Sequence, residues 1–142
     1  MAKRREKTMR PPQELLQDVS WTFAGSKFRS EAEFVEAVHQ DEREYLAHIG
    51  QPGESHWQAD EVVLRCHRVI VEHDYGDCDE DEVAELEADN PGGFTAGELL
   101  FKTHNAFVEI LDGRDHHFFE GYMLIKQKNP NAVPRYEVWL GS

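Results

Sequence analysis

The chain has 142 residues, 39% of them hydrophobic and 11% aromatic, and a formal net charge of −13 at pH 7. This length and composition fit one globular domain with its own hydrophobic core. No run of 18 apolar residues occurs, and no apolar stretch follows the basic N-terminus, which argues against a membrane-spanning helix and against a secretory signal. We therefore expect a cytoplasmic location, with Cys66 and Cys78 as reduced thiols.

A basic tail precedes a strongly acidic body. Residues 1–10 contain five basic residues and one acidic residue, which leaves ten basic and 27 acidic residues, a net charge of −17, on the other 132. We expect residues 1–12 to form a disordered basic tail and residues 13–142 to form a single domain. A body this acidic repels phosphate backbones, so we expect the domain itself to bind no nucleic acid.

The first third of the body predicts a helix with a defined start and end. Gln13–Val19 is compatible with a short helix, and Trp21–Phe28 with an extended segment. Ser30 and Glu33 then form a capping box, in which the serine oxygen and the glutamate side chain satisfy unpaired backbone donors. Apolar residues at helical spacing follow, and Gly50 marks the end of the predicted helix.

The middle third combines a strand with an acidic segment. Trp57–Glu72 is rich in β-branched residues and partly apolar on both faces, which predicts an internal strand. Asp74–Asp89 contains nine acidic residues and no lysine or arginine, and its second half, Asp79–Asp89, is compatible with a short acidic helix. Asn90–Gly93 predicts a break before the next element.

The last third predicts a helix followed by two strands. Thr95 and Glu98 form a second capping box, and an apolar stripe continues to a stop at Gly113. His116–Lys126 and Arg135–Leu140 resemble strands joined as a hairpin. The order of elements favours an α+β fold: a mostly antiparallel sheet with two main helices packed on one face.

One candidate site is a histidine cluster after this helix. In a regular strand one face carries His116, Phe118, Glu120 and Tyr122. The other face carries His117, Phe119, Met123 and Ile125. A helix packed on the second face would bring His104 to His117. The candidate metal ligands are therefore His104, His116, His117 and Glu120, as in a metal-dependent hydrolase. No established zinc spacing occurs, and a polar turn with a hydrogen-bonded His104 explains the same residues without a metal or any other cofactor.

The acidic segment is the stronger functional candidate. Dense carboxylates can steer a basic partner to a docking face, although a solvated loop that aids solubility has the same composition. The predicted binding residues are seven acids and two aromatic anchors: Asp77, Asp79, Glu80, Asp81, Glu82, Glu85, Glu87, Tyr75 and Trp57. We expect a non-enzymatic acidic protein-binding domain, such as an inhibitor or an immunity-type protein for a basic partner.

A third hypothesis is a structural or assembly subunit. The alternating segment Tyr136–Leu140 is compatible with an edge strand through which two copies pair as a homodimer.

Overall fold

The structure, a computed structural model, describes residues 11–55, 57–73, 83–112, 118–125 and 132–141. The main sheet contains, in spatial order, β1 (Glu14–Leu15), β7 (Phe118–Leu124), β8 (Arg135–Gly141), β4 (Arg68–His73) and β5 (Val83–Glu87). The two-residue strand β2 (Trp21–Thr22) also pairs with β7. All of these pairs are antiparallel except β4 with β8, which is parallel.

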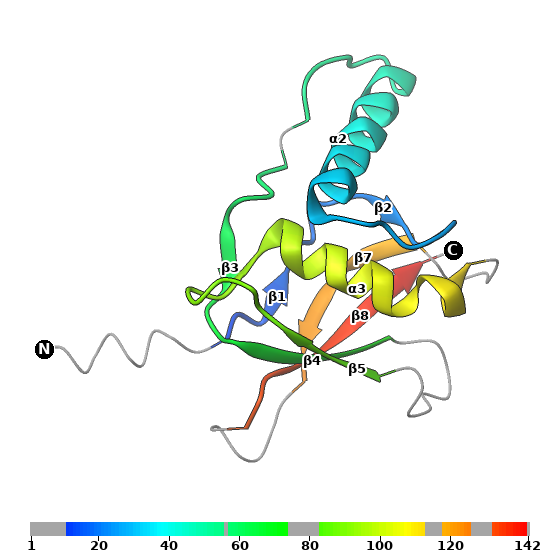
Figure 1. Cartoon of the computed structure of the whole chain (residues 1–142). Coiled ribbons are helices and arrows are strands. Elements are labelled where there is room, and N and C mark those ends of the chain that lie inside the picture. The colour runs from blue at the N-terminus through cyan, green and yellow to red at the C-terminus, as the bar shows by residue number, and fades with distance from the viewer. Residues whose placement is uncertain (1–10, 56, 74–82, 113–117, 126–131, 142) are drawn as a thin grey trace, which may run out of the picture.

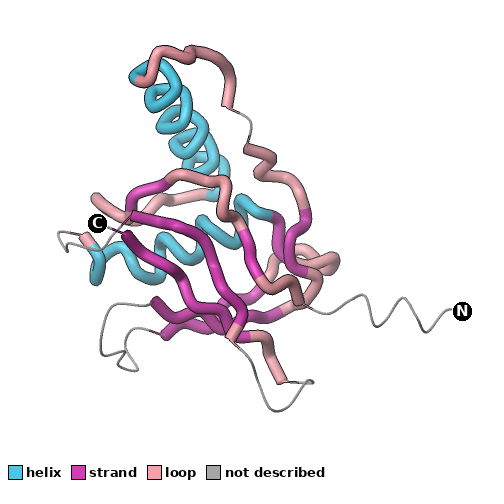
Figure 2. The backbone as a smooth tube through the Cα atoms, turned by 180° about the vertical axis from the view of Figure 1, so that it is seen from behind, coloured by secondary structure: helices cyan, strands magenta, loops and turns pink. Residues whose placement is uncertain are grey.

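Two helices lie on one side of this sheet, and no helix among the described residues covers its other face (Figures 1 and 2). Helix α3 (Ala96–Leu111) packs on the sheet, and α2 (Glu31–His48) packs mainly against α3. A small ribbon of β3 (Val62–Leu64) and β6 (Phe94–Thr95) adjoins the start of α3. The predicted α+β fold, with two helices and a mostly antiparallel sheet, is confirmed.

Both helices begin at the predicted caps. The hydroxyl oxygen of Ser30 accepts a hydrogen bond from the backbone N–H of Glu33 at 3.2 Å. The hydroxyl oxygen of Thr95 accepts one from the N–H of Glu98 at 3.1 Å. The caps fix where each helix starts, and so which side chains of α3 face the sheet.

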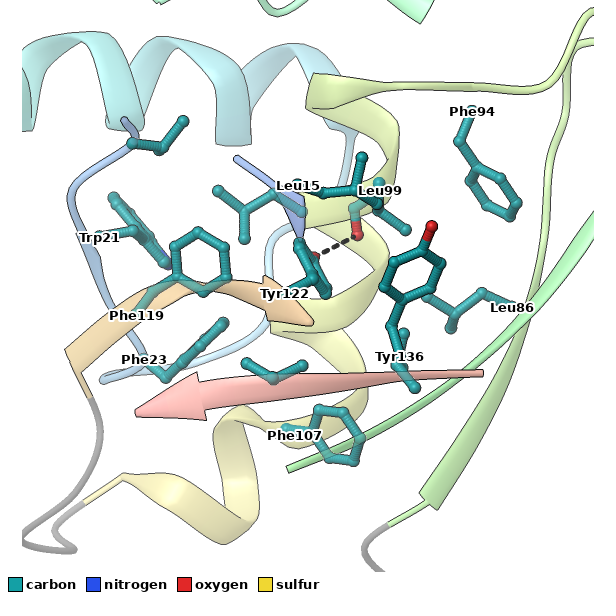
Figure 3. Close-up of a cluster of buried hydrophobic side chains, with 14 of the residues drawn as sticks. Leu15, Trp21, Phe23, Leu86, Phe94, Leu99, Phe107, Phe119, Tyr122 and Tyr136 are labelled. Carbon is teal, nitrogen blue, oxygen red and sulfur yellow. Dashed lines mark hydrogen bonds between the residues drawn. The ribbon is translucent and has the colours of Figure 1, made fainter. Parts of the chain in front are cut away.

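The core forms between α3 and the sheet. Ten of the sixteen residues of α3 are buried, against residues such as Phe119, Tyr122 and Tyr136 (Figure 3). The hydroxyl of Tyr122 donates to the Thr103 hydroxyl at 2.8 Å and lies 3.5 Å from the Leu99 carbonyl oxygen. These bonds satisfy a polar group that is otherwise surrounded by apolar side chains.

A β-bulge in β7 overturns the predicted alternation of its side chains. Phe119 pairs with Leu140 but Tyr122 pairs with Val138, so β7 has one extra residue between these pairs. Gly121 takes a φ of +117° there, a conformation that favours glycine. Phe119 and Tyr122 therefore both face the core, whereas strict alternation had predicted opposite faces.

Three other predictions were wrong, each because long-range pairing outweighs local sequence preference. Gln13–Val19 is not a helix, because Glu14 and Leu15 pair with β7 as strand β1. The described part of the predicted acidic helix is strand β5, in which Leu86 faces the core while its glutamate neighbours are exposed. The C-terminal strand is not at an edge, because β8 lies between β7 and β4.

The predicted strand Trp57–Glu72 is divided into β3 and β4. The part in β4 is internal, as predicted, because β8 and β5 flank it. The predicted disordered tail lies outside the described residues except for Pro11 and Pro12. The carbonyl oxygen of Pro12 accepts a hydrogen bond from the Tyr136 hydroxyl at 2.6 Å, so this residue belongs to the folded unit.

Candidate functional site

The most distinctive surface is the free edge of β5, which ends the sheet next to α3 (Figure 1). The backbone N–H of Ala88 donates to the His67 carbonyl oxygen at 2.8 Å. Because ladder bonds alternate along an antiparallel pair, the backbone groups of residues 84, 86 and 88 face β4, and those of 83, 85 and 87 face away from it. Among the described residues, no strand pairs with this outer side of β5.

A lysine of α3 confirms the direction of these groups. The ammonium of Lys102 donates to the backbone carbonyl oxygen of Glu87 at 2.5 Å, from the side opposite β4. The same ammonium lies 3.0 Å from carboxylate oxygens of Asp89 and of Glu98. Lys102 therefore satisfies one outward carbonyl and links the end of β5 to α3.

A shallow hollow of about 740 Å³ lies between β5 and α3. Partly or fully buried apolar side chains of Leu86, Ala88 and Ala106 contribute to its lining, together with Glu87 and Asp89. A second hollow of about 410 Å³ adjoins it, because Asp89 lines both. We call the carboxylates of the two hollows the acidic edge: Glu31, Glu85, Glu87, Asp89 and Glu98.

The acidic edge has an excess of negative charge. Burial raises the pKa of Glu31, and repulsion by Glu98 and Asp89 raises it further. Burial acts to lower the pKa of Lys102, but its hydrogen bonds to Glu98 and Asp89 outweigh this effect and raise it. Lys102 and Arg68 thus compensate only part of the charge of the five carboxylates, so an additional cation is favoured there.

Only part of the predicted binding set can be placed. Glu85 and Glu87 are exposed on β5, and Glu85 pairs with Arg68 at 3.0 Å between two half-exposed side chains, which is worth little. Trp57 lines a different hollow of about 630 Å³ that shares no lining residue with the one beside β5. The other predicted residues lie outside the described ranges: Tyr75, Asp77, Asp79, Glu80, Asp81 and Glu82.

Sequence reasoning missed three members of the acidic edge. Glu31 and Glu98 were interpretable as helix-start residues, since acidic side chains favour the first turn. Asp89 was counted in the acidic segment, but nothing in its spacing predicts the contact with Lys102. An available signal was Lys102 itself, a lone cation in the apolar stretch of α3.

The predicted metal ligand His104 has both ring nitrogens in use. The indole N–H of Trp21 donates to its Nδ1 at 3.1 Å, and since an indole is only a donor, Nδ1 must be the acceptor. The proton therefore sits on Nε2, which donates to the carbonyl oxygen of Ser26 at 3.0 Å. The ring is 0% exposed among four aromatic rings, so a metal would have to displace a satisfied network.

The rest of the predicted metal cluster is not assembled within the described residues. Glu120 is exposed on β7, and His116 and His117 lie outside the described ranges. Across the part of the chain that the structure describes, no three His, Cys, Asp or Glu side chains converge as ligands. The metal site stays a prediction for the two undescribed histidines, and His104 gives it no support.

A second polar cluster escaped sequence reasoning. The Ser55 hydroxyl donates to a Glu42 carboxylate oxygen at 2.5 Å and lies 2.7 Å from Nδ1 of His39. Here serine bridges the acid and the histidine, whereas a catalytic triad places histidine in the middle. The cluster joins the loop after α2 to the helix. Ser55 is 13 residues from Glu42 and 16 from His39 in the sequence, so no local motif could have predicted the contacts.

The buried His104 predicts sensitivity to acid. Burial lowers its pKa, although the bond to Ser26 partly opposes this. In the unfolded chain the ring has a pKa of about 6.5, so below that pH the unfolded state takes up a proton that the folded state excludes. The titration of His104 therefore leaves the free energy of unfolding at its full value above about pH 6.5. Below that pH it lowers the free energy of unfolding by about 1.4 kcal/mol per pH unit, until the pKa of the folded state is reached.

Urea unfolding of the wild type and of His104→Gln between about pH 7.5 and about pH 5 measures this effect, because the variant lacks only this titration. We expect the difference in stability between the two proteins to shrink as the pH falls. A difference that is constant over this range would contradict the assignment of a neutral His104.

Within the described residues, no helix is long and apolar enough to cross a membrane. Comparisons of the chain with protein-family models, curated proteins and solved structures found no match. The function is therefore inferred from the geometry and charge of the chain itself.

Proposed function

We propose that this protein is a non-enzymatic binding domain whose acidic edge receives a basic segment of another protein. The supporting observation is the coincidence of three properties at one place: a sheet edge that no described strand covers, an adjoining hollow, and five carboxylates, three of which pair with Lys102 or Arg68. An inhibitor or an immunity-type protein that neutralises a basic partner would need such a surface.

The electrostatics favour a cationic partner in two ways. Burial is the largest cause of the raised pKa of Glu31, and repulsion by Glu98 and Asp89 adds to it, so an added positive charge would relieve this repulsion. The net charge of −13 also attracts a basic protein before contact and so raises its association rate. Both contributions weaken as salt screens the charges.

A synthetic octapeptide of alternating lysine and valine, with blocked ends, tests the proposal. We expect it to bind in calorimetric titrations and to lose about tenfold or more in affinity as NaCl rises from about 50 mM to about 300 mM. The corresponding peptide of glutamate and valine should not bind. Failure of the lysine peptide to bind at low salt would overturn the proposed function.

Matched charge reversals at two positions test whether the lysine peptide binds at the acidic edge. Glu87→Lys should weaken binding of the lysine peptide about tenfold, because it places a like charge in the acidic edge. Glu54→Lys makes the same change in net charge on the exposed loop after α2, which lies far from β5 (Figure 1), and should have little effect. Equal losses in the two variants would mean that net charge alone attracts the peptide, and would contradict a docking site at β5.

A further inference from the structure

We infer that the acidic edge binds its partner by strand addition: an extended segment with alternating basic and apolar residues pairs with β5. This inference rests on the proposed function and specifies the conformation and the sequence pattern of the partner. It depends on the backbone of β5, on the hollow beside it, and on the charges of the glutamates.

The backbone of β5 offers a short row of hydrogen-bonding groups. Glu85 directs both its N–H and its carbonyl oxygen away from β4, as the pairing of β4 with β5 requires. Val83 directs both of its groups to the same side, and the N–H of Glu87 extends the row at the other end. Five outward groups are enough to hold a segment of about four to five residues as a new strand.

Lys102 sets one end of this row. Its ammonium already occupies the carbonyl oxygen of Glu87, so an added strand cannot use that acceptor without displacing a charge-assisted bond. The available ladder therefore runs from Val83 to the N–H of Glu87.

The two faces of the added strand meet different surroundings. Side chains on one face would continue the exposed outer face of β5, beside Glu85 and Glu87, where lysine or arginine is favoured. Those on the other face would point toward α3 and into the hollow that Leu86 and Ala106 help to line, where small apolar residues are favoured. Strict alternation of basic and apolar residues is the pattern that satisfies both faces.

The same charges argue against a second copy of this chain as the occupant. Antiparallel pairing of two β5 edges would bring Glu85 and Glu87 of each copy together on one face, and like charges directly opposite each other destabilise a sheet. Charged side chains on an edge commonly prevent such self-association. A basic segment converts this repulsion into attraction.

Two peptides of equal composition separate strand addition from simple charge attraction. The first alternates lysine and valine, and the second has four lysines followed by four valines. We expect the alternating peptide to bind about tenfold more tightly, since only in it do the residues paired with β5 direct lysines to the glutamates and valines to the hollow at the same time. Equal affinity would overturn strand addition while leaving the acidic docking site intact.

A pair of substitutions at one position tests the backbone. Glu85→Gln removes the charge and keeps the N–H, and should weaken binding about threefold. Glu85→Pro also removes the N–H, and should weaken binding about tenfold further. Proline is tolerated in an edge strand where the N–H faces solvent, and a urea unfolding curve for each variant checks that both are folded.

Alternating peptides with backbone N-methyl groups on every second residue or on every residue test the same point without altering the protein. Methylation of one alternate set blocks one edge of the peptide and so restricts the direction in which it can pair with β5, whereas methylation of both sets blocks both edges and should abolish binding. Retention of binding by the fully methylated peptide, or equal binding to Glu85→Gln and Glu85→Pro, would overturn the inference. A dimer of the free protein in light scattering, lost in Glu85→Pro, would assign the edge to a second copy instead.

Discussion

Replacing His104 with alanine should lower the free energy of unfolding by about 3–5 kcal/mol, a large fraction of the stability of an ordinary domain. The substitution leaves the Trp21 indole N–H and the Ser26 carbonyl oxygen without their buried partner. It also opens a cavity between rings whose centroids lie 5.2–5.9 Å from that of His104. Urea unfolding followed by tryptophan fluorescence measures the loss.

Two controls separate these causes. His104→Gln restores an acceptor and a donor in the cavity, so it should recover part of the stability lost in the alanine variant. His48→Ala, at the exposed end of α2, should change the free energy of unfolding by less than about 0.5 kcal/mol. A loss for His104→Ala as small as that for His48→Ala would show that the packing of the rings around position 104 does not depend on this histidine.

Gly93→Ala should destabilise the fold by about 2–5 kcal/mol, because backbone strain and overpacking occur together. Gly93 has a φ of +121°, and a Cβ there would lie 2.2 Å from the Leu64 carbonyl oxygen and 2.9 Å from the Arg65 Cα. These are backbone atoms, so the methyl group cannot be accommodated by a side-chain rotation. Relief would require β6 to move away from β3, which would displace the start of α3.

The neighbouring glycine is the matched control for this substitution. A Cβ on Gly92 would lie 3.4 Å from an Asn90 side-chain oxygen, an ordinary contact, and its φ lies outside the left-handed range. Gly92→Ala should therefore stay within about 0.5 kcal/mol of the wild type. Thermal unfolding of the two variants makes the comparison, and equal melting temperatures would contradict the close approach of β6 to β3.

Local sequence signals predicted the features that depend on neighbouring residues, above all the starts of the two helices. Ser30 and Thr95 cap their helices as expected, because the bond from each cap hydroxyl joins residues only three apart in the sequence. The α+β class followed from the order of helical and strand-like segments. By contrast, the parallel contact of β4 with β8 joins segments far apart in the chain, and no local pattern encodes it.

The candidate site was predicted only in outline for the same reason. Glu85 and Glu87 stood out by composition, but their placement on an edge strand depends on pairing with β4. The bulge at Gly121 moved Tyr122 to the core and removed the basis for the predicted alternation on β7. His104 was predicted as a metal ligand or, alternatively, as a hydrogen-bonded residue, and its complete burial depends on Trp21 and Phe28, which lie far away in the sequence.

The position of β8 in the sheet has a consequence for the order of folding. It pairs with β7 on one side and with β4 on the other, yet it follows every other described strand along the chain. Until β8 docks, β7 and β4 each present an edge, and the sheet consists of two separate parts. Contacts between distant segments cost loop entropy before they return any stabilisation, so joining the two halves is a late and slow step. During synthesis, β7 and β4 would therefore each keep an unpaired edge until β8 is available.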